Sequence, residues 1–541
     1  MLDNNQQEMQ KRLMIFFLIV SAFMIGFGIF QTFTSTPAQN KTQQTQTTSG
    51  NEVQTQSTTQ KVQKEKEDAS QESKPTLIKT TGSYDLILTN QRFNSDNLKN
   101  VIEINTSYGK VQISKIGARV VSVYLNQYKI DAIPKIAKDN KVFPTEIITT
   151  DPRITALLNF SEYKFKQEGN LYIFELNRDN IYIKKIFKLN DDETISVSLE
   201  HRGLENLGIA TINGITPPEE ESSFGHRGSV IKTDKQLIKI DADIQTTQII
   251  RDNILWAGEE NKYFLQILAN KTGFSTVYVI PIAQNTTITL AEIKGNLDGF
   301  FFGGAKLYSL LGEITEKYRK LWDVDLNLRE TIDFGFFGIL GKPLFLLLHL
   351  IYDFIPNWGI AIIILTIILR IVLFPLNHKS LKAMKKMADL APEIQKLQKK
   401  YKDDPQRLQQ EMMRLYAEHG ANPMSGCLPI LAQIPIFIAL YNVLMVAVEL
   451  KNVPFLWVPD LSEHDPFYIL PILMGLSMIA QQWITPSSDK NQKFIMYAMA
   501  GIFTFLFMNF PAGLVLYWLT NNILGLIQSF FVNKTMNTEK K

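Results

Sequence analysis

One arginine lies inside an otherwise apolar stretch, and its position is the strongest indication of chemistry in the sequence. Arg370 stands in the run ILTIILRIVLFPL, where Thr366 is the only polar neighbour within four residues. A charge inside a membrane-spanning segment costs several kcal/mol unless it snorkels to the interface or faces water. Because residues four apart share one face of a helix, Thr366 is expected next to Arg370, while Gln433 and Tyr517 are polar candidates from other apolar runs for the same cavity.

A purely structural explanation of Arg370 also has to be considered. Arg370 lies roughly two turns from the expected cytoplasmic end of its run, at ~1.5 Å per residue. From there the long side chain of Arg370 reaches lipid phosphate by snorkelling. The residues by themselves leave the two interpretations open.

Other kinds of chemistry have little support in the sequence. Its 541 residues carry a net charge of +3, which is too small to indicate nucleic-acid binding, and Cys427 is the single cysteine. No intrachain disulfide and no cysteine-based zinc site can therefore form. The sequence contains no Walker loop, no HExxH and no GxSxG motif. We therefore expect a protein that is not an enzyme and that uses no metal or cofactor.

The apolar residues that would position Arg370 form runs long enough to cross a bilayer. We predict six spans of ~20 residues or slightly fewer, the first of them an uncleaved anchor at Leu13–Phe30. An amphipathic interfacial helix is expected to precede the second span. The expected segments are an anchor at 1–33, a flexible polar linker at 34–80, a β domain at 81–332, the interfacial helix at 333–357, span two at 358–376, a basic helical hairpin at 377–423, spans three to six at 424–532 and a short tail at 533–541.

The region 81–332 shows the alternation of a β-sandwich. Apolar side chains recur at every second position in segments such as Ile195, Val197 and Leu199, and turn residues separate the segments. The fold class is therefore a multi-pass helical membrane protein with a large all-β sandwich domain. A carbohydrate-binding or enzymatic role of that domain is not excluded by fold.

The distribution of charge predicts the orientation of the chain in a bacterial inner membrane. The loop 377–423 holds ten Lys or Arg residues, whereas 448–466 has one Lys and four acidic residues. The positive-inside rule therefore places the first loop and both termini in the cytoplasm, and the β domain in the periplasm.

The basic loop has the pattern of a helical hairpin. The first apolar stripe is expected on a single helix, and Asp403, Asp404 and Pro405 are expected to end that helix and begin the next, which carries Leu408, Met412 and Leu415. Lysines near the membrane are expected either to fix orientation on anionic lipid or to recruit ribosomes, targeting factors or nascent chains. The residues of this predicted recruitment surface are Lys379, Lys382, Lys385, Lys386, Met387, Leu390, Ile394 and Leu397, and the stripe continues to Tyr401.

Three long motifs resemble the signature of the YidC family of membrane protein insertases, which has Oxa-type and Albino-type relatives. They are NPMSGCLPILAQIPIFIALYNVLMVAVEL, FLWVPDLSEHDPFYILPILMG and FPAGLVLYWLTNN. The resemblance covers about residues 333 to 531, and the anchor with a large outer domain is similar to the Gram-negative members. It implies that Arg370 lies in a water-filled groove open to the cytoplasm and to lipid. It also implies that Thr366, Tyr517 and Trp518 contact substrate, with Trp518 standing where many relatives have tyrosine.

The function that the resemblance implies is insertion and folding of newly made inner-membrane proteins. The expected partners are nascent membrane proteins and the bilayer, with the Sec translocon, accessory subunits and the ribosome or a targeting factor as further candidates and no direct contact with nucleic acid. Two other classes of function remain possible from the residues. One is a secondary transporter in which Arg370 binds an anionic solute, although the spans show no inverted repeat. The other is an envelope scaffold that presents the β domain.

Overall fold

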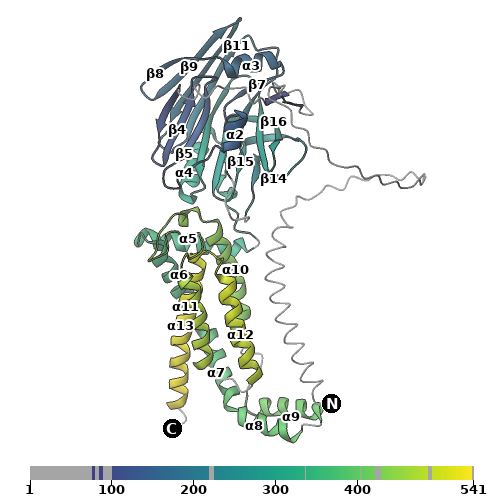
Figure 1. The fold of residues 1–541 in the computed structure, drawn as a ribbon, viewed down its shortest axis with the longest axis vertical. Helices are drawn as coiled ribbons and strands as arrows, with labels where there is room; N and C mark the ends of the chain where they lie inside the picture. The colour runs from purple at the N-terminus through teal and green to yellow at the C-terminus, as the bar shows by residue number, and fades with distance from the viewer. Residues whose placement is uncertain are drawn as a thin grey trace, which may run out of the picture.

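The computed structural model consists of an all-β domain joined end to end with a bundle of helices (Figure 1). The described residues are 76–79, 85–88, 100–218, 225–335, 337–401, 404–420, 428–484 and 490–538. The predicted anchor at 1–33 and nearly all of the linker at 34–80 lie outside them. The combination of a large β domain with a helical region confirms the broad fold class.

The described part of the β domain contains two antiparallel sheets that share one apolar core, and a separate two-stranded sheet made by β1 and β2. The larger sheet has twelve strands, in the order β14-β13-β15-β16-β18-β11-β10-β9-β8, with β12, β17 and β7 attached beside β16, and the smaller has the order β3-β4-β5-β6. On β11 the side chains of Ile195, Val197 and Leu199 all point into the core, as their alternation predicts. The strands are β1 (Thr76–Lys79), β2 (Asp85–Leu88), β3 (Val101–Asn105), β4 (Gly109–Ser114), β5 (Arg119–Leu125), β6 (Ile130–Asp131), β7 (Ile147–Thr149), β8 (Lys164–Glu168), β9 (Leu171–Arg178), β10 (Ile181–Leu189), β11 (Ile195–Arg202), β12 (Ile209–Ile215), β13 (Gly228–Thr233), β14 (Leu237–Asp241), β15 (Gln248–Glu260), β16 (Phe264–Ala283), β17 (Thr286–Ile293) and β18 (Leu297–Ala305).

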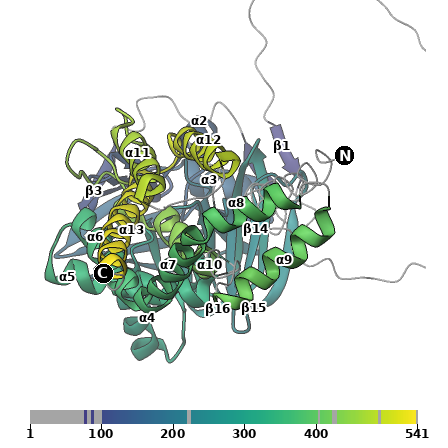
Figure 2. The same ribbon diagram turned by 90° about the horizontal axis from the view of Figure 1, so that it is seen from below.

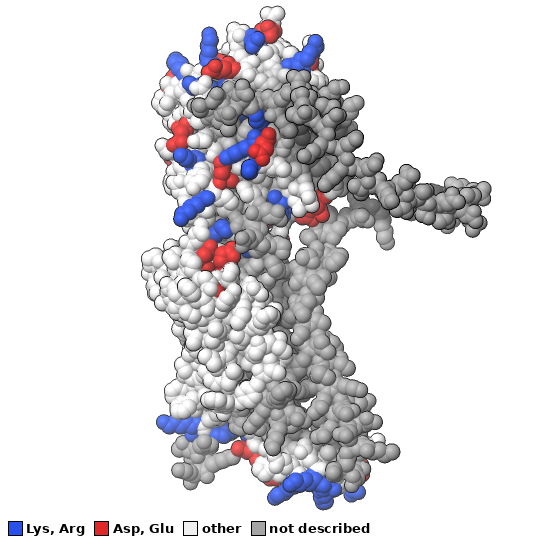
Figure 3. Space-filling view, viewed as in Figure 1, with Lys and Arg blue, Asp and Glu red and all other residues white. Residues whose placement is uncertain are grey.

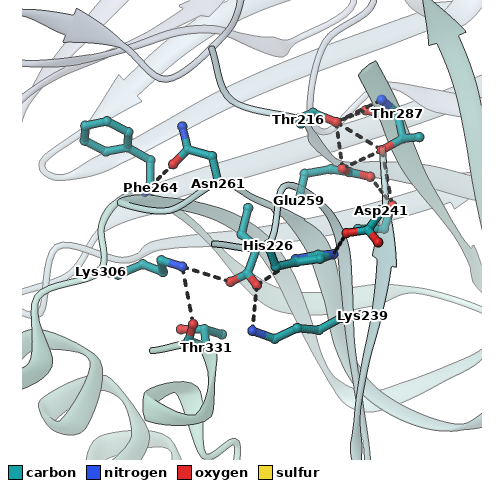
Figure 4. A network of polar contacts seen from close by, with 12 residues as sticks. Thr216, His226, Lys239, Asp241, Glu259, Asn261, Phe264, Thr287, Lys306 and Thr331 are labelled. Carbon is teal, nitrogen blue, oxygen red and sulfur yellow. Dashed lines mark hydrogen bonds and ion pairs between the residues drawn. The ribbon is translucent and has the colours of Figure 1, made fainter. Parts of the chain in front are cut away.

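A buried ionic network closes the end of the large sheet from which the chain leaves the domain (Figure 4). Glu260 on β15 is fully buried and lies 3.2 Å from the Nζ atom of Lys239 and 3.3 Å from that of Lys306. The Nδ1 atom of His226 lies 3.0 Å from the same carboxylate. Burial by itself would raise the pKa of Glu260, but these positive charges and the histidine hydrogen bond hold it well below its usual range. Glu260 is therefore an ionised carboxylate with a full set of partners.

The neighbouring Glu259 has hydroxyl partners in place of charged ones. Thr216 and Thr287 donate hydrogen bonds of 2.9 and 2.8 Å to it, and Ser229 donates a third. Burial raises the pKa of Glu259 to about 8, against the opposing effect of these hydrogen bonds. Two adjacent carboxyl groups thus differ in ionisation because their partners differ.

Short helices connect the β domain to the bundle. Helix α4 (Tyr308–Trp322) packs on the sheet through Tyr318, whose ring stacks 4.0 Å from that of Phe300. The domain also contains α2 (Lys135–Asn140) and α3 (Pro152–Phe160), and the 3-10 helix η2 (Leu328–Thr331) follows α4. At the bundle side, the Glu449 carboxylate accepts a hydrogen bond of 3.1 Å from the backbone N–H of Tyr308. The two regions are therefore in direct polar contact.

The helical region differs in detail from the predicted spans. Helix α13 alone among the described helices is long and apolar enough for a membrane span, over Ala512–Thr535, and a second span results if α6 and α7 are counted together. The predicted number of six spans is not confirmed. The helices are α5 (Gly338–Phe354), α6 (Trp358–Val372), α7 (Phe374–Asp389), α8 (Ala391–Lys400), α9 (Pro405–Glu418), α10 (Leu428–Val446), the 3-10 helix η4 (Val448–Leu450), α11 (Ile469–Ile484), α12 (Lys490–Phe507) and α13 (Ala512–Thr538).

The predicted second span, 358–376, is wrong at its end. Helix α6 stops at Val372, and α7 leaves it at an angle of 65°. Pro375 in the first turn of α7 explains the break, because proline cannot donate a backbone hydrogen bond and its ring clashes with the carbonyl group four residues earlier, in α6. The elbow at Leu373 therefore turns the chain out of the bundle three residues after Arg370.

Helices α8 and α9 form a small pair at the end of the molecule farthest from the β domain (Figure 1), and both are seen from below in Figure 2. Leu390, Ile394 and Leu415 make its core, with Leu397, Met412 and Tyr416 around them. Asp404 caps α9 by accepting a hydrogen bond of 3.0 Å from the N–H of Arg407, while Asp403 lies outside the described residues. The prediction of one helix from Met387 to Tyr401 is wrong, because α7 ends at Asp389 and Pro392 begins a new helix.

A broad belt without charged side chains surrounds the bundle on the visible face (Figure 3). Lys, Arg, Asp and Glu gather on the β domain above the belt, and mainly Lys and Arg gather below it. Large apolar side chains are exposed on the helices within it, including Ile502, Phe505 and Phe530. An exposed apolar surface of this extent marks a region that is covered by lipid or by another protein.

Candidate functional site

The guanidinium of Arg370 lies inside the helical bundle, between α6, α11 and α13. Its Nη1 donates a hydrogen bond of 3.3 Å to the Oδ1 atom of Asn521 on α13. A side chain on Gly525, one turn further along α13, would place its Cβ 2.5 Å from Nη2 of Arg370 and 3.3 Å from the Gln481 amide nitrogen. The missing side chain of Gly525 therefore makes the space in which the guanidinium sits.

The hydrogen-bonding partner of Arg370 is the neutral amide of Asn521. Within the described part of the chain, no carboxylate forms an ion pair with it, and its Nε atom is buried without a hydrogen-bond partner. A buried charge without a counter-charge is costly for stability. Such an arrangement leaves the positive charge available to an anionic group that arrives from outside the protein.

Three of the other predicted site residues lie close to Arg370, namely Tyr517, Gln433 and Thr366. Tyr517 lies one turn before Asn521 on α13, its hydroxyl is hydrogen-bonded with the side chain of Gln433 on α10, and the charge of Arg370 acts on the same hydroxyl. Thr366 lies one turn before Arg370 on α6 but is almost fully buried. The Thr366 hydroxyl donates a hydrogen bond of 2.7 Å to the carbonyl oxygen of Ile362 on its own helix. The hydroxyl of Thr366 is therefore already used within α6, and Thr366 contributes mainly through the packing of its methyl group.

Trp518 faces a different part of the bundle from Arg370. Its ring lies 4.7 Å from that of Phe437 on α10 and 6.1 Å from that of Phe503 on α12, measured between centroids. Helix α13 packs along α6 and α11, α12 packs along α11, and α10 packs mainly on α5. Trp518 and these rings thus bridge α10 and α12, which do not pack on each other. The result is an aromatic surface next to the polar site, of the kind that suits an amphipathic segment.

Several polar residues around Arg370 were missed in the sequence. Asn522 donates a hydrogen bond of 3.0 Å to Ser477, which joins α13 to α11 at the level of Asn521. The pairs Asn521–Asn522 and Gln481–Gln482 are visible as polar residues inside apolar runs, and such residues commonly lie inside a helical bundle. That signal could have identified them, whereas nothing in the sequence singles out Gly525.

The lysines of the predicted recruitment surface divide into two kinds. Lys385 is buried, and its Nζ atom donates a hydrogen bond of 3.0 Å to the backbone oxygen of Asn533 on α13. Its inclusion in an exposed recruitment surface is therefore wrong, because it fixes α7 to α13. Lys379 and Lys386 are exposed on α7 and Lys382 is half-buried, while the side chain of Met387 lies outside the described set.

Comparisons with known proteins agree on one family. Residues 350–540 match the family model of the 60Kd inner membrane protein. The chain is 36% identical over 541 residues to the membrane protein insertase YidC of Aquifex aeolicus, covering 100% of this chain and 98% of that one. It is 33% identical over 459 residues to the same protein of Campylobacter jejuni, covering 81% and 84%.

Solved structures give a weaker likeness. The crystal structure of an active YidC insertase with its first transmembrane domain resolved aligns over 79% of this chain and 92% of its own, with 20% identity and a TM-score of 0.39. The family relation therefore comes from the sequence matches.

Proposed function

This chain belongs to the YidC family of membrane protein insertases, and we propose that it inserts new inner-membrane proteins by holding their polar outer segments at Arg370. The observation that carries the proposal is a partly buried guanidinium that donates to one amide, that of Asn521, and that has, among the described residues, no carboxylate in an ion pair with it. The cost of holding such a charge is offset when an acidic group pairs with it. The site is thus suited to a client and is incomplete without one.

The proposed first step is electrostatic capture of the client. A charge at reduced dielectric attracts an opposite charge several times more strongly than it would in water. Acidic or polar residues in the short outer tail of a client are drawn to Arg370, with Asn521 and the Tyr517–Gln433 pair as further hydrogen-bonding groups. The tail then lies partway across the bilayer and no longer has to cross it in one step.

The proposed second step is movement of the apolar segment into lipid. Removing apolar surface from water is favourable by about 25 cal/mol per Å², which is enough for a ~20-residue helix to insert without nucleotide hydrolysis. The aromatic surface of Trp518, Phe437 and Phe503 lies where α10 and α12 stay apart. We infer that the client leaves the bundle between these two helices.

The proposed membrane placement follows from the belt and the charges. The uncharged belt seen in Figure 3 would lie in hydrocarbon, with six spans that include the anchor at 1–33. Helix α5 lies across the end of the bundle that faces the β domain (Figure 1), as expected for an interfacial helix. The β domain is then periplasmic, and both termini and the α8–α9 pair are cytoplasmic.

The α8–α9 pair is the proposed recruitment element. Its apolar core is small, and basic side chains such as Lys396 and Arg414 lie on its helices. Such a surface suits an acidic partner, and we propose that it receives a ribosome or targeting factor carrying a nascent chain. Cooperation with the Sec translocon is a further part of the proposal.

The test measures insertion by the purified full-length protein in proteoliposomes. Clients carry a short outer tail with either acidic or neutral residues. Replacing Arg370 with Ala is expected to lower insertion of the acidic-tailed client about tenfold, the loss of one charge-assisted contact, while Arg370→Lys keeps part of the activity. The matched control is Arg319→Ala, which removes an exposed arginine paired with Glu316 on α4. Equal insertion by the Arg370→Ala variant and the wild type would refute the capture step.

A second test locates the client directly. A photoreactive residue at Tyr517 or Thr366 should crosslink to a stalled nascent membrane protein, because both positions lie within one turn of the Arg370 site along their helices. Crosslinks found equally at Leu321, an exposed position in the β domain, would show that contact is unspecific.

A further inference from the structure

A second feature of the bundle is a cavity of about 410 Å³ between the α6–α7 elbow and the later half of α13. Its polar lining comes from Arg370 and His378 on one wall and from Gln528 and Thr535 on the other, and its apolar lining includes Ile371, Ile527 and Phe531. The volume is many times the ~30 Å³ that a water molecule occupies in the liquid. It falls in the range of sites for small molecules.

Three of the four polar side chains of the cavity have an unused hydrogen-bonding atom, whereas the hydroxyl of the fourth, Thr535, donates to the backbone oxygen of Phe531. Gln528 is only 7% exposed, and its Oε1 atom has no partner, although its Nε2 atom lies 3.5 Å from the backbone oxygen of Phe374. The Nε atom of Arg370 and the Nδ1 atom of His378 are likewise buried and unpartnered. Buried polar atoms in proteins nearly always have partners. Three such atoms around one cavity therefore indicate a ligand that supplies them.

The mouth of the cavity is apolar and faces outward. Ile371 is 66% exposed, Phe531 is 62% exposed and Ile527 is 49% exposed. They lie within the part of the molecule that forms the uncharged belt. A ligand that enters here must combine an apolar portion with a polar head.

The cavity lies on a different side of α13 from the side that packs against α11. Asn522 and Asn533 face α11, where they make hydrogen bonds to Ser477 and to the backbone oxygen of Ile484. At 100° per residue, Ile527 and Phe531 project from roughly the opposite side of the helix. By the same spacing, Tyr517 lies on the face of α13 that carries Leu524 and Gln528, so the cavity continues from the client site and shares Arg370 with it, whereas Trp518 projects away from Ile527.

From these observations we propose that the cavity binds one anionic phospholipid with a hydroxyl-bearing headgroup, such as phosphatidylglycerol. The phosphate accepts hydrogen bonds from Arg370 and His378, and a headgroup hydroxyl donates to Oε1 of Gln528. One acyl chain lies along Ile371, Ile527 and Phe531. The proposal uses the same membrane placement as the proposed function, but it does not depend on how clients are captured.

The charges of the cavity favour this occupant over the chain's own N-terminal run. The lining contains Arg370 and no carboxylate, so it complements an anion. The apolar run from Leu13 to Phe30 has no acidic residue and offers no anionic group to Arg370. A phospholipid supplies both the anion and the apolar chain.

The test uses full-length protein in proteoliposomes that contain a small fraction of phosphatidylglycerol with a photoreactive group in one acyl chain. Light-induced labelling is expected in the segments 364–378 and 524–535. Replacing His378 with Leu removes a phosphate donor, and replacing Ile527 with Trp fills the cavity. Each variant should lower labelling of both segments about tenfold, as expected for the loss of one charge-assisted hydrogen bond or of the site itself.

The matched control is Ile523→Trp, which places the same ring one turn away at a residue of similar exposure outside the cavity lining. This variant should label like the wild type, and a photoreactive phosphatidylcholine should label the two segments weakly. Client insertion is measured in the same vesicles. Insertion that persists in Ile527→Trp shows that the variant is folded, and it separates loss of the lipid site from failure of the insertase.

Two results would overturn the proposal. One is labelling that is spread evenly over α11, α12 and α13 and is unchanged by Ile527→Trp. The other is efficient crosslinking of a cysteine at position 527 to residues 13–30, which would show that the chain's own apolar run fills the cavity. Displacement of the label by inorganic phosphate would assign the site to a free anion and would equally contradict a lipid.

Discussion

The β domain encloses a charged side chain completely, the helical bundle encloses one in part, and the two regions give these charges opposite kinds of partners. Glu260 is enclosed by Lys239, Lys306 and His226, so its charge is neutralised within the domain (Figure 4). Arg370 in the bundle has the amide of Asn521 as its hydrogen-bonding partner and keeps an unpartnered nitrogen.

The contrast distinguishes a charge that holds a fold together from a charge kept for a ligand. Breaking a fully paired buried group is strongly destabilising, because its partners lose their counter-charge. Removing an unpaired buried charge relieves the cost of its desolvation. Such a substitution should therefore preserve stability and impair the function that uses the charge. The same reasoning predicts which substitutions affect stability and which affect insertion.

The largest expected effect is on the stability of the β domain. Replacing Glu260 with Gln leaves Lys239 and Lys306 without their shared carboxylate, and it should lower the free energy of unfolding of the domain by about 3–5 kcal/mol. The measurement is pulse proteolysis in urea on the membrane-embedded protein. Glu316→Gln, at an exposed ion pair with Arg319, is the control and should change stability by no more than about 1 kcal/mol. Equal effects of the two substitutions would remove the basis of the comparison.

A second expectation concerns the pH dependence of the same domain. Because burial raises the pKa of Glu259 to about 8, the folded state holds this proton while the unfolded chain releases it above about pH 4.5. Stability should therefore fall between pH 5 and pH 7, by about 1 kcal/mol per pH unit from this group. Burial also lowers the pKa of Lys185 to about 7, and that group adds stability as pH rises above 7, outside this window.

The check compares the wild type with Glu259→Gln across that window. The substituted protein should show the flatter pH profile, since it has no proton to lose at this position. Parallel profiles for the two proteins would mean that Glu259 is already ionised in the folded domain.

The third expectation is that Arg370 behaves in the opposite way to Glu260. Replacing Arg370 with Leu should leave the free energy of unfolding unchanged or raise it, because a buried charge with incomplete partners is removed. Insertion of an acidic-tailed client should fall about tenfold in the same preparation. A loss of stability comparable to that of Glu260→Gln would show that Arg370 is a structural residue.

The smallest expected effect on insertion is that of filling the space beside the Arg370 guanidinium, which Gly525 leaves open. A Cβ at position 525 would lie 2.5 Å from Nη2 of Arg370, so Gly525→Ala must displace the guanidinium. Insertion should fall about threefold, less than for loss of the charge, because a flexible side chain can move aside. Gly501→Ala on α12 is the matched control, since nothing lies within 4 Å of its Cβ. A similar decrease in both variants would attribute the effect to helix packing in general.

The broad architecture can be predicted from the sequence because it depends on the spacing of apolar residues along the chain. Alternating residues such as Ile195 and Val197 face one core, and the change from this alternation to long apolar runs marks the change from sheet to helix. Arg370 stands out in the sequence because a charge in an apolar run is rare. These are local signals that need no knowledge of distant contacts.

Two of the missed features depend on contacts between distant segments. Glu259 and Glu260 are adjacent in the sequence, yet they acquire different partners from strands far along the chain. Gly525 matters because Arg370 approaches it from another helix. The break at Leu390 is different, since Pro392 is a local signal for the start of a helix and is visible in the sequence.

The most direct test of the central claim is a charge reversal at Arg370. Insertion into proteoliposomes is measured for clients with acidic and basic outer tails, using the wild type and Arg370→Glu. If Arg370 pairs with the client tail, the wild type prefers the acidic tail, and Arg370→Glu loses that client and gains activity toward the basic one. If both proteins insert the two clients with the same preference, the guanidinium does not contact the tail and the capture mechanism is wrong.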